Sequence, residues 1–441
     1  MAAPVLIQPT TIALKLREWQ KIGPEDNRAL AGYSFQEPAV QATARQLTQS
    51  GMLDVVELVQ GLEIRTNQYV GSIQMGDLRL TILPKINGMP LLNLLRYAYG
   101  FRQLDFFTPL ELGTESGLFQ DLLIQQLAAE ARELLERGLH RRYERVDENL
   151  ASPRGRINFA DLSRQGGLVT ASLPCTHFVR IENNLLNQCL LAGLLMASRL
   201  TDDLALRSHL RQSARILGQS VHTVPLAVHL LEKAQSSIDR QTQAYQPALQ
   251  IIQILLESQG ISLENDTQRV QVPGFLFDMN RFFQALLDRF LTDNLEDYTL
   301  RSEHKLRKML SYHPEHNPHF KKSPTPRPDF AILQGKKVIA LLDAKYRDLG
   351  QTELPREMLY QLALYAFSQD RPGKSTILYP TLDVMTSESW VEIAHPLSGE
   401  RLARVILRPV NLHRLEALIR AGTTRERAEF AMWLAFGKLP L

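Results

Sequence analysis

The stretch PDFAILQGKKVIALLDAK, residues 328–345, decides the fold of the C-terminal part of this chain. In it, the glycine-containing link QGKK separates two apolar runs, FAIL and VIALL, and this arrangement is typical of a β-hairpin. If the turn is centred near position 336, Asp329 and Asp343 lie seven residues from it on either side. We therefore expect the two aspartates to face each other across the hairpin.

A lysine completes this charged group. Lys345 follows Asp343 by two residues, so both side chains point to the same face of the strand. Two carboxylates this close repel each other unless a cation lies between them, and their oxygens suit Mg²⁺ or Mn²⁺. The pattern indicates metal-assisted phosphodiester hydrolysis, with Asp329 and Asp343 as metal ligands and Lys345 orienting or deprotonating a water. The alternative is that these are ordinary solvated charges at strand ends.

Further elements are expected on both sides of the hairpin. Asp278 suits an N-cap, and the apolar residues that follow it at helical spacing predict a helix over 278–292. A short strand near 298–301, a helix over 354–367 and a strand over 376–379 follow. The expected order is therefore helix, three strands, helix, strand.

With this order and its motif Pro328-Asp329 and Asp343-Ala344-Lys345, the sequence resembles the PD-(D/E)XK nuclease superfamily. The resemblance implies an αβββαβ core and a Mg²⁺-dependent endodeoxyribonuclease. Gln361 and Tyr365, spaced i, i+4 on one helix face, are similar to the Q-x-x-x-Y element of the RecB-like branch. By resemblance they lie beside the active site and help to orient the lysine or the DNA.

The sequence departs from the superfamily at one position. A glutamate on the first core helix often completes the metal shell, and it is expected at position 284, where this chain has Gln284. A glutamine is a neutral and weaker ligand. Asp288, one helical turn further on, is the alternative candidate for this role.

The wider chain resembles the McrC family, the nuclease subunits of McrBC modification-dependent restriction systems. The resemblance rests on the segments VG at 70–71, ILPKI at 82–86, PRGRI at 153–157, IENNL at 181–185 and DMNR at 278–281, together with the nuclease motif. It implies that the N-terminal half engages a hexameric AAA+ GTPase or ATPase of the McrB type and stimulates NTP hydrolysis. The C-terminal half would cut DNA, with modified bases recognised by the partner.

The function predicted from the sequence is therefore a metal-dependent DNA endonuclease subunit of a McrBC-like restriction complex that serves in phage defence. Two alternatives remain open. The chain is a non-catalytic activator or scaffold of an AAA+ NTPase, which Gln284 would favour, or it is a stand-alone RecB-like repair nuclease. Intact Asp329, Asp343 and Lys345 speak against the first alternative, and an assay without a partner tests the second.

Length and composition bound these predictions. A chain of 441 residues suggests two or three domains in an α+β multidomain fold. We expect a mixed α/β partner-binding region over 1–160, a helical region over 161–270 and the nuclease domain over 271–441. In the first, alternating Leu78, Leu80 and Ile82 predict a strand after a Gly76-Asp77 turn.

Charge and cysteine content exclude several classes of protein. A net charge of +3 argues against a histone-like binder, and 44% hydrophobic with 22% charged residues excludes wholesale disorder. Only Cys175 and Cys189 occur, which excludes a disulfide framework and suits a reducing cytosol. The sequence shows no signal peptide and no apolar run of the roughly 20 residues that a membrane span needs, so a cytoplasmic protein without membrane contact is expected.

Four further patterns each have a functional and an ordinary interpretation. Gly373-Lys374-Ser375 resembles the end of a Walker A loop but lacks its first glycine and follows a helix, so we expect no nucleotide there. The histidines at 313, 316 and 319 suggest zinc, but a solvated loop suits the interspersed prolines better. Segment 301–327 has seven basic and two acidic residues, and it either follows a DNA backbone or is an ordinary charged loop. Arg154 and Arg156 contact DNA or the partner, or they brace a domain junction.

Overall fold

The computed structural model describes residues 12–103, 119–164, 171–259, 274–317, 319–350, 352–370 and 372–437. The chain divides into two compact units, one of residues 1–101, 112–119 and 258–441, and the other of 102–111 and 120–257. The boundary predicted at 160 falls inside helix α4 (Phe159–Arg164) of the second unit. The boundary predicted at 270 lies outside the described residues.

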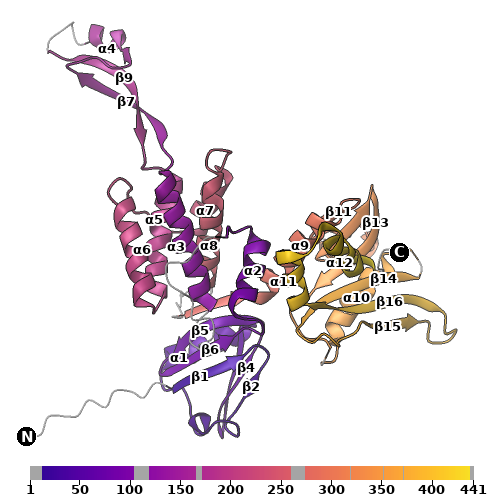
Figure 1. The fold of residues 1–441 in the computed structure, drawn as a ribbon. Coiled ribbons are helices and arrows are strands. Elements are labelled where there is room, and N and C mark those ends of the chain that lie inside the picture. The colour runs from indigo at the N-terminus through magenta and orange to yellow at the C-terminus, as the bar shows by residue number, and fades with distance from the viewer. Residues whose placement is uncertain are drawn as a thin grey trace, which may run out of the picture. The chain divides into compact units, whose positions relative to one another are not determined.

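A four-stranded sheet forms the N-terminal part of the first unit, in the order β1–β6–β5–β10 (Figure 1). Its strands are β1 (Ile12–Arg17), β5 (Tyr69–Met75), β6 (Leu78–Leu83) and β10 (Gly274–Asp278). The predicted turn at Gly76-Asp77 joins β5 to β6, and the alternating residues of β6 are buried as expected. A second sheet of β2 (Lys21–Ile22), β4 (Gly61–Thr66) and β3 (Leu53–Leu58) lies in the same part of the chain, with helices α1 (Pro38–Gln49) and α2 (Gly88–Tyr99).

Strand β10 was not predicted, and it connects two parts of the first unit. It pairs antiparallel with β5 from Gly274 opposite Ile73 to Asp278 opposite Tyr69. The pairing needs a glycine at Gly71, where a Cβ would lie 2.0 Å from the Phe275 carbonyl oxygen. Helix α9 (Met279–Asn294) follows at once, with Asp278 as its predicted N-cap. The last strand of the N-terminal sheet therefore leads directly into the first helix of the C-terminal part.

The C-terminal part is a six-stranded sheet in the order β11–β12–β13–β14–β16–β15. Its strands are β11 (Thr299–Ser302), β12 (Phe330–Gln334), β13 (Lys337–Ala344), β14 (Gly373–Thr381), β15 (Ser389–Ala394) and β16 (Arg401–Asn411); its helices are α9, α10 (Arg356–Phe367), α11 (Leu412–Ala421) and α12 (Thr424–Phe436). The predicted hairpin is confirmed, because β12 and β13 pair antiparallel with Phe330 opposite Leu342. The predicted order of helix, three strands, helix and strand is also present, as α9, β11, β12, β13, α10 and β14.

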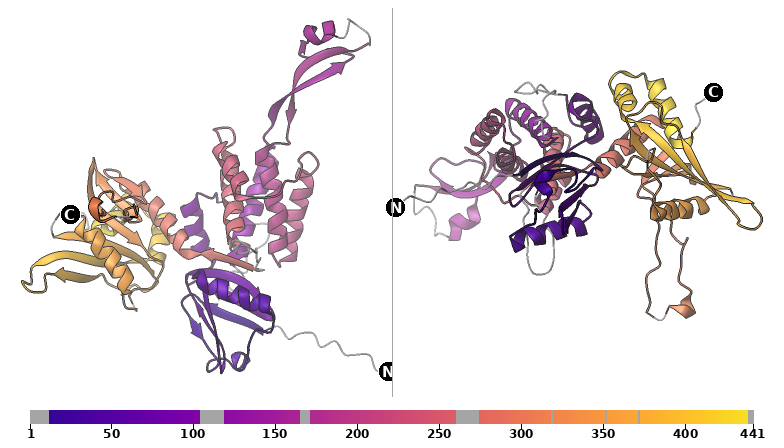
Figure 2. Two further views of the ribbon diagram at one scale, coloured as in Figure 1. Left: turned by 180° about the vertical axis from the view of Figure 1, so that it is seen from behind. Right: turned by 90° about the horizontal axis from the view of Figure 1, so that it is seen from below.

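The second unit combines helices with a projecting pair of strands. The helices are α3 (Phe119–Arg137), α5 (Leu185–Leu200), α6 (Leu204–Leu217), α7 (Val228–Ser236) and α8 (Gln246–Ser258). From them β7 (Arg142–Leu150) and β9 (Leu173–Ile181) extend as a long antiparallel ribbon, with β8 (Arg156–Ile157) and α4 at its far end (Figures 1 and 2). We call β7, β8, β9 and α4 the arm. The region predicted to be helical over 161–270 therefore also contains a strand, β9.

The cysteines and the most apolar helices bear on two expectations drawn from composition. Cys175 and Cys189 are both buried free thiols. Across the described ranges, none of the helices combines the length and the apolar character that crossing a bilayer requires.

Candidate active site

The hairpin brings the three predicted catalytic side chains together. Asp329 directly precedes β12, and Asp343 lies near the end of β13, so the register of the hairpin sets them opposite each other. The Lys345 ammonium Nζ lies 3.0 Å from Asp343 Oδ2 and 3.6 Å from Asp329 Oδ2. Two carboxylates and one ammonium therefore share a single site, as the spacing predicted.

Asp343 is the most deeply buried member of the group. Only 1% of it is exposed, and within the described structure neither carboxylate oxygen accepts a hydrogen bond of good geometry, although Lys345 is within ion-pair distance. Burial, and then the charge of Asp329, raise the pKa of Asp343 to about 6. Burial alone would lower the pKa of Lys345, but Asp343 and Asp329 together raise it above its ordinary value. One ammonium faces two carboxylates, and buried carboxylate oxygens without a hydrogen bond fit a divalent cation.

Asp329 is held by two donors. Its Oδ2 accepts a hydrogen bond from the Ala344 backbone N–H at 2.8 Å and another from Gln284 Nε2 at 3.1 Å. Asp288, the alternative candidate on the same helix, instead accepts a hydrogen bond from the Ser302 hydroxyl. The side chain of Gln284 therefore contacts Asp329, whereas the side chain of Asp288 contacts Ser302 instead.

Gln361 and Tyr365 support the site through the backbone. Gln361 Nε2 donates to Tyr365 Oη at 2.6 Å, and Tyr365 Oη donates to the Arg327 carbonyl oxygen at 2.8 Å. Burial, above all, raises the pKa of Tyr365, so its hydroxyl stays protonated and able to donate. The pair shares one helix face, as predicted, and its hydrogen bonds fix the segment that leads into Asp329.

Sequence analysis did not identify Asn280, which also takes part in the site. Its Oδ1 accepts a hydrogen bond from the backbone N–H of Tyr346, the residue after Lys345, at 2.9 Å. Asn280 lies one helical turn before Gln284, so α9 presents two amide side chains to the same site. The i, i+4 spacing of Asn280 and Gln284 on the predicted helix was the sequence signal that could have identified Asn280.

A cleft with basic walls begins next to Asp329. The Glu303 N–H donates to the Asp329 carbonyl oxygen at 2.8 Å, and the cleft that follows has a volume of about 990 Å³. Its lining includes Arg301, Lys305, Arg307 and Lys308. Part of the basic segment 301–327 therefore lines a cleft close to Asp329, and basic side chains of this kind suit a phosphate backbone.

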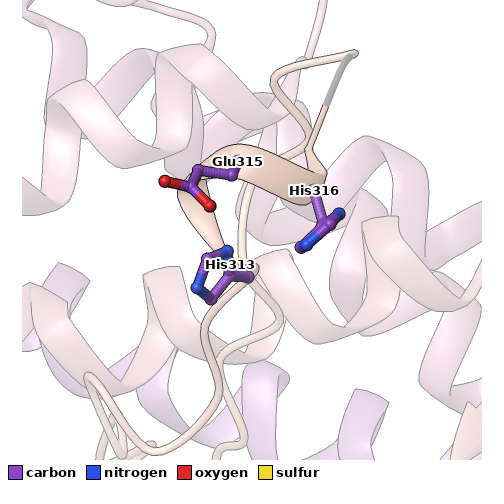
Figure 3. A group of neighbouring side chains, drawn as sticks. All are labelled: His313, Glu315 and His316. Atoms are coloured by element: carbon purple, nitrogen blue, oxygen red, sulfur yellow. The ribbon is translucent and has the colours of Figure 1, made fainter.

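The histidine-rich loop forms a different cluster from the one considered in the sequence. His313, Glu315 and His316 each offer a ligand atom, and these atoms lie within 4.8 Å of one another (Figure 3). The third member of the cluster is Glu315, whereas the zinc site considered from the sequence would have used His319. All three side chains are exposed, and exposed polar groups gather in this way without a metal, so the cluster remains a surface feature.

The remaining patterns have ordinary explanations or remain as predictions. Gly373 and Ser375 lie in strand β14, where a Cβ on Gly373 would come 1.9 Å from the Ala366 carbonyl oxygen and the Ser375 hydroxyl donates to the Leu362 carbonyl oxygen. This is not the loop of a phosphate-binding site. Arg156 is exposed in β8 of the arm, and Arg154 is exposed in the loop between β7 and β8.

Comparison with known proteins places the chain in a family. Residues 64–380 match the family described as "McrBC 5-methylcytosine restriction system component". The fold is similar to that of a chain in the half-complex of Thermococcus gammatolerans McrB AAA+ hexamers with bound McrC, with 19% identity, a TM-score of 0.59, and coverage of 93% of this chain and 99% of that chain. A chain of the Thermococcus gammatolerans McrBC complex matches with 19% identity and a TM-score of 0.46 over 64% of this chain and 88% of that one. No curated protein sequence matches this one. Because the family match spans well over half of its length, the chain belongs to the McrBC 5-methylcytosine restriction system component family.

Proposed function

We propose that this chain is the DNA-cutting subunit of a McrBC-type restriction complex, with a PD-(D/E)XK core that uses Mg²⁺ or Mn²⁺. The observation that carries the proposal is the buried Asp343 carboxylate, whose oxygens accept no hydrogen bond in the described structure although Asp329 and Lys345 lie beside it. A purely structural site would leave an excess buried negative charge, which is unfavourable. A cation bound for catalysis would balance this charge.

Each residue has a part in phosphodiester hydrolysis. Asp329 and Asp343 would hold the cation, which when bound lowers the pKa of a water and stabilises charge on the phosphate. The Ala344 N–H and Gln284 fix the Asp329 carboxylate, so that its second oxygen remains free to bind the cation. Lys345, charged between the two aspartates, orients the attacking water or donates to a phosphate oxygen. Gln361 and Tyr365 hold the backbone at Arg327, two residues before Asp329, in place.

The second part of the proposal concerns the partner. The similar solved assembly contains McrB AAA+ hexamers with bound McrC, and we infer that this chain binds a hexameric AAA+ NTPase of that type. The arm provides a surface suited to a protein partner, because Tyr143, Phe159 and Phe178 are each more than 60% exposed on it. Arg145 and Arg156 line a cavity of about 620 Å³ next to Phe159 and Phe178. Aromatic and arginine side chains of this kind are typical of binding hot spots.

The site is tested by replacing Lys345 with alanine in the full chain and assaying it with the partner, methylated DNA and Mg²⁺. We expect cleavage to fall by about 10²–10⁴-fold, because the group that acts on the water or phosphate is lost. Stimulation of the partner's NTP hydrolysis should stay at the wild-type level, since the arm is unchanged. Cleavage by Lys345→Ala within tenfold of wild type would remove the nuclease assignment.

A second candidate function rests on Gln284. The neutral amide in place of a glutamate favours a chain that only activates the NTPase. Under that alternative, the wild-type chain with Mg²⁺ or Mn²⁺ stimulates NTP hydrolysis and leaves DNA uncut. Cutting by the chain alone, without the partner, would instead indicate the stand-alone nuclease.

A further inference from the structure

Tyr346, the residue directly after Lys345, is held entirely by groups from outside its own hairpin. Its backbone N–H donates to Asn280 Oδ1 at 2.9 Å, its carbonyl oxygen accepts from Trp19 Nε1 at 3.1 Å, and its hydroxyl donates to Glu18 Oε1 at 3.3 Å. Only 1% of the residue is exposed. Every polar group of Tyr346 is therefore engaged.

Glu18 and Trp19 come from the N-terminal sheet, where they directly follow β1. The Glu18 carboxylate accepts a second hydrogen bond from the backbone N–H of Lys85 at 3.0 Å. Lys85 lies two residues after β6, so the N-terminal sheet itself fixes the position of Glu18. Trp19 has a φ of 60°, which is uncommon for a bulky residue and indicates a conformation held by its surroundings. The Arg347 guanidinium carbon lies 5.3 Å from the centre of the Trp19 ring, within the range of a cation–π contact.

A second connection reaches the active site from the same sheet. Strand β10 pairs with β5, and the Met279 N–H at the start of α9 donates to the Gln68 carbonyl oxygen at 3.1 Å. Helix α9 then presents Asn280 to Tyr346 and Gln284 to Asp329. Helix α9, which continues from the N-terminal sheet, therefore contacts the residues next to both hairpin strands, Asp329 before β12 and Tyr346 after β13. Glu18 and Trp19 contact Tyr346 as well.

We propose that Trp19 and Glu18 are positioning residues for Lys345, acting through Tyr346. The inference rests on the proposed nuclease function and deepens it: the N-terminal sheet is part of the apparatus that sets the geometry of the catalytic lysine. A displacement of about 1 Å in a catalytic group can lower the rate about 100-fold, so even a modest loosening of Tyr346 becomes measurable. The C-terminal sheet by itself, without Glu18 and Trp19, lacks two of the three groups that hold this residue.

The test uses Trp19→Phe and Tyr346→Phe in the full chain, with the partner, methylated DNA and saturating Mg²⁺. Each variant removes one hydrogen bond and keeps an aromatic ring, and each should lower kcat for cleavage about tenfold with KM for DNA unchanged. Stimulation of NTP hydrolysis should stay at the wild-type level. Glu18→Gln, which keeps the acceptor oxygen, should cleave within about twofold of wild type, whereas Glu18→Leu should fall about tenfold.

Tyr97→Phe is the matched control. It also removes a phenol-to-carboxylate hydrogen bond between the N-terminal part and α9, from Tyr97 Oη to Asp293 Oδ2 at 2.8 Å, but at the far end of that helix. Its cleavage should stay within about twofold of wild type.

Three outcomes separate the possibilities. If Trp19→Phe and Tyr346→Phe cleave like Tyr97→Phe while Lys345→Ala is inactive, the positioning role is wrong and the nuclease assignment stands. If Glu18→Gln falls as far as Glu18→Leu and both lose Tm, the contact is only structural and the proposal is likewise overturned. If Lys345→Ala itself cleaves normally, the proposed function fails. Should Tyr346→Phe not fold, the milder Trp19→Phe decides the question.

Discussion

The hairpin β12–β13 and the arm strands β7–β9 are both antiparallel pairs, yet they differ in where their charges lie. In the hairpin most apolar residues are buried, and Asp329, Asp343 and Lys345 gather at the end away from the turn, with Asp343 inside β13 and the other two just outside the strands. Along β7 nearly every residue is exposed. Charges gathered at one end of a largely buried hairpin interact strongly with one another because the local dielectric constant is low, whereas charges spread along an exposed ribbon are available to attract another surface.

This difference predicts that changes in the two regions affect different measurements. Replacing Tyr143 and Phe178 by serine removes two exposed aromatic side chains from the arm without opening a cavity. We expect the double variant to need about 100-fold more protein for half-maximal stimulation of the partner's NTPase, because aromatic anchors dominate protein interfaces. The measurement is NTP turnover as a function of subunit concentration.

Phe320→Ser is the matched control for the arm, since Phe320 is 91% exposed but lies outside it. This variant should stimulate the NTPase like wild type. If the arm variant stimulates the partner's NTPase as well as the Phe320→Ser control does, the arm is not the contact surface. The hairpin and the arm would then not have the separate functions proposed here.

A smaller effect is expected inside the hairpin site at Gln284. Its amide contacts Asp329, so Gln284→Glu would place a third carboxylate beside the cation. We expect the Mg²⁺ concentration for half-maximal cleavage to fall a few-fold, about three- to tenfold, because an added negative ligand binds a hard cation more tightly. Titration of cleavage against Mg²⁺ measures it.

Asp288→Asn is the comparison variant, because Asp288 accepts a hydrogen bond from Ser302 and is not expected to contribute to the proposed metal site. Its Mg²⁺ midpoint should remain unchanged. If the Mg²⁺ midpoint shifts in Asp288→Asn and stays unchanged in Gln284→Glu, then Asp288, and not residue 284, contributes the additional metal ligand on α9.

The hairpin could be predicted from the sequence because its contacts are local. The position of the turn fixes which residues pair, so Asp329 and Asp343 followed from counting, and the strand period placed Lys345 beside them. Gln361 and Tyr365 were placed on one face by their spacing. Their acceptor, the Arg327 carbonyl oxygen, is a backbone atom that carries no signal in the residue types.

The contacts that escaped prediction join distant segments or lack an apolar pattern. Trp19 reaches Tyr346 across 327 residues, and no periodicity encodes such a contact. The run GFLFD of β10 carries no strand signal of its own, because composition does not distinguish a short buried strand from the buried end of the helix that follows it. Strand β7 has no buried face, so the alternation of buried and exposed residues that reveals a strand is missing in it.

The proposed metal site can be tested most directly by the thermal stability of wild type and Asp343→Asn with and without Mn²⁺. The pKa of Asp343 is raised from 3.8 to about 6, so the metal-free folded chain holds this proton more tightly than the unfolded chain does, and stability falls as pH rises from about 4 to about 6. At pH 7 without metal, Asp343→Asn should therefore be more stable than wild type, by roughly 1–3 kcal/mol. Addition of Mn²⁺ should raise the Tm of wild type and leave that of Asp343→Asn unchanged. An equal rise in both, or no rise in wild type, would contradict a cation site formed by Asp329 and Asp343.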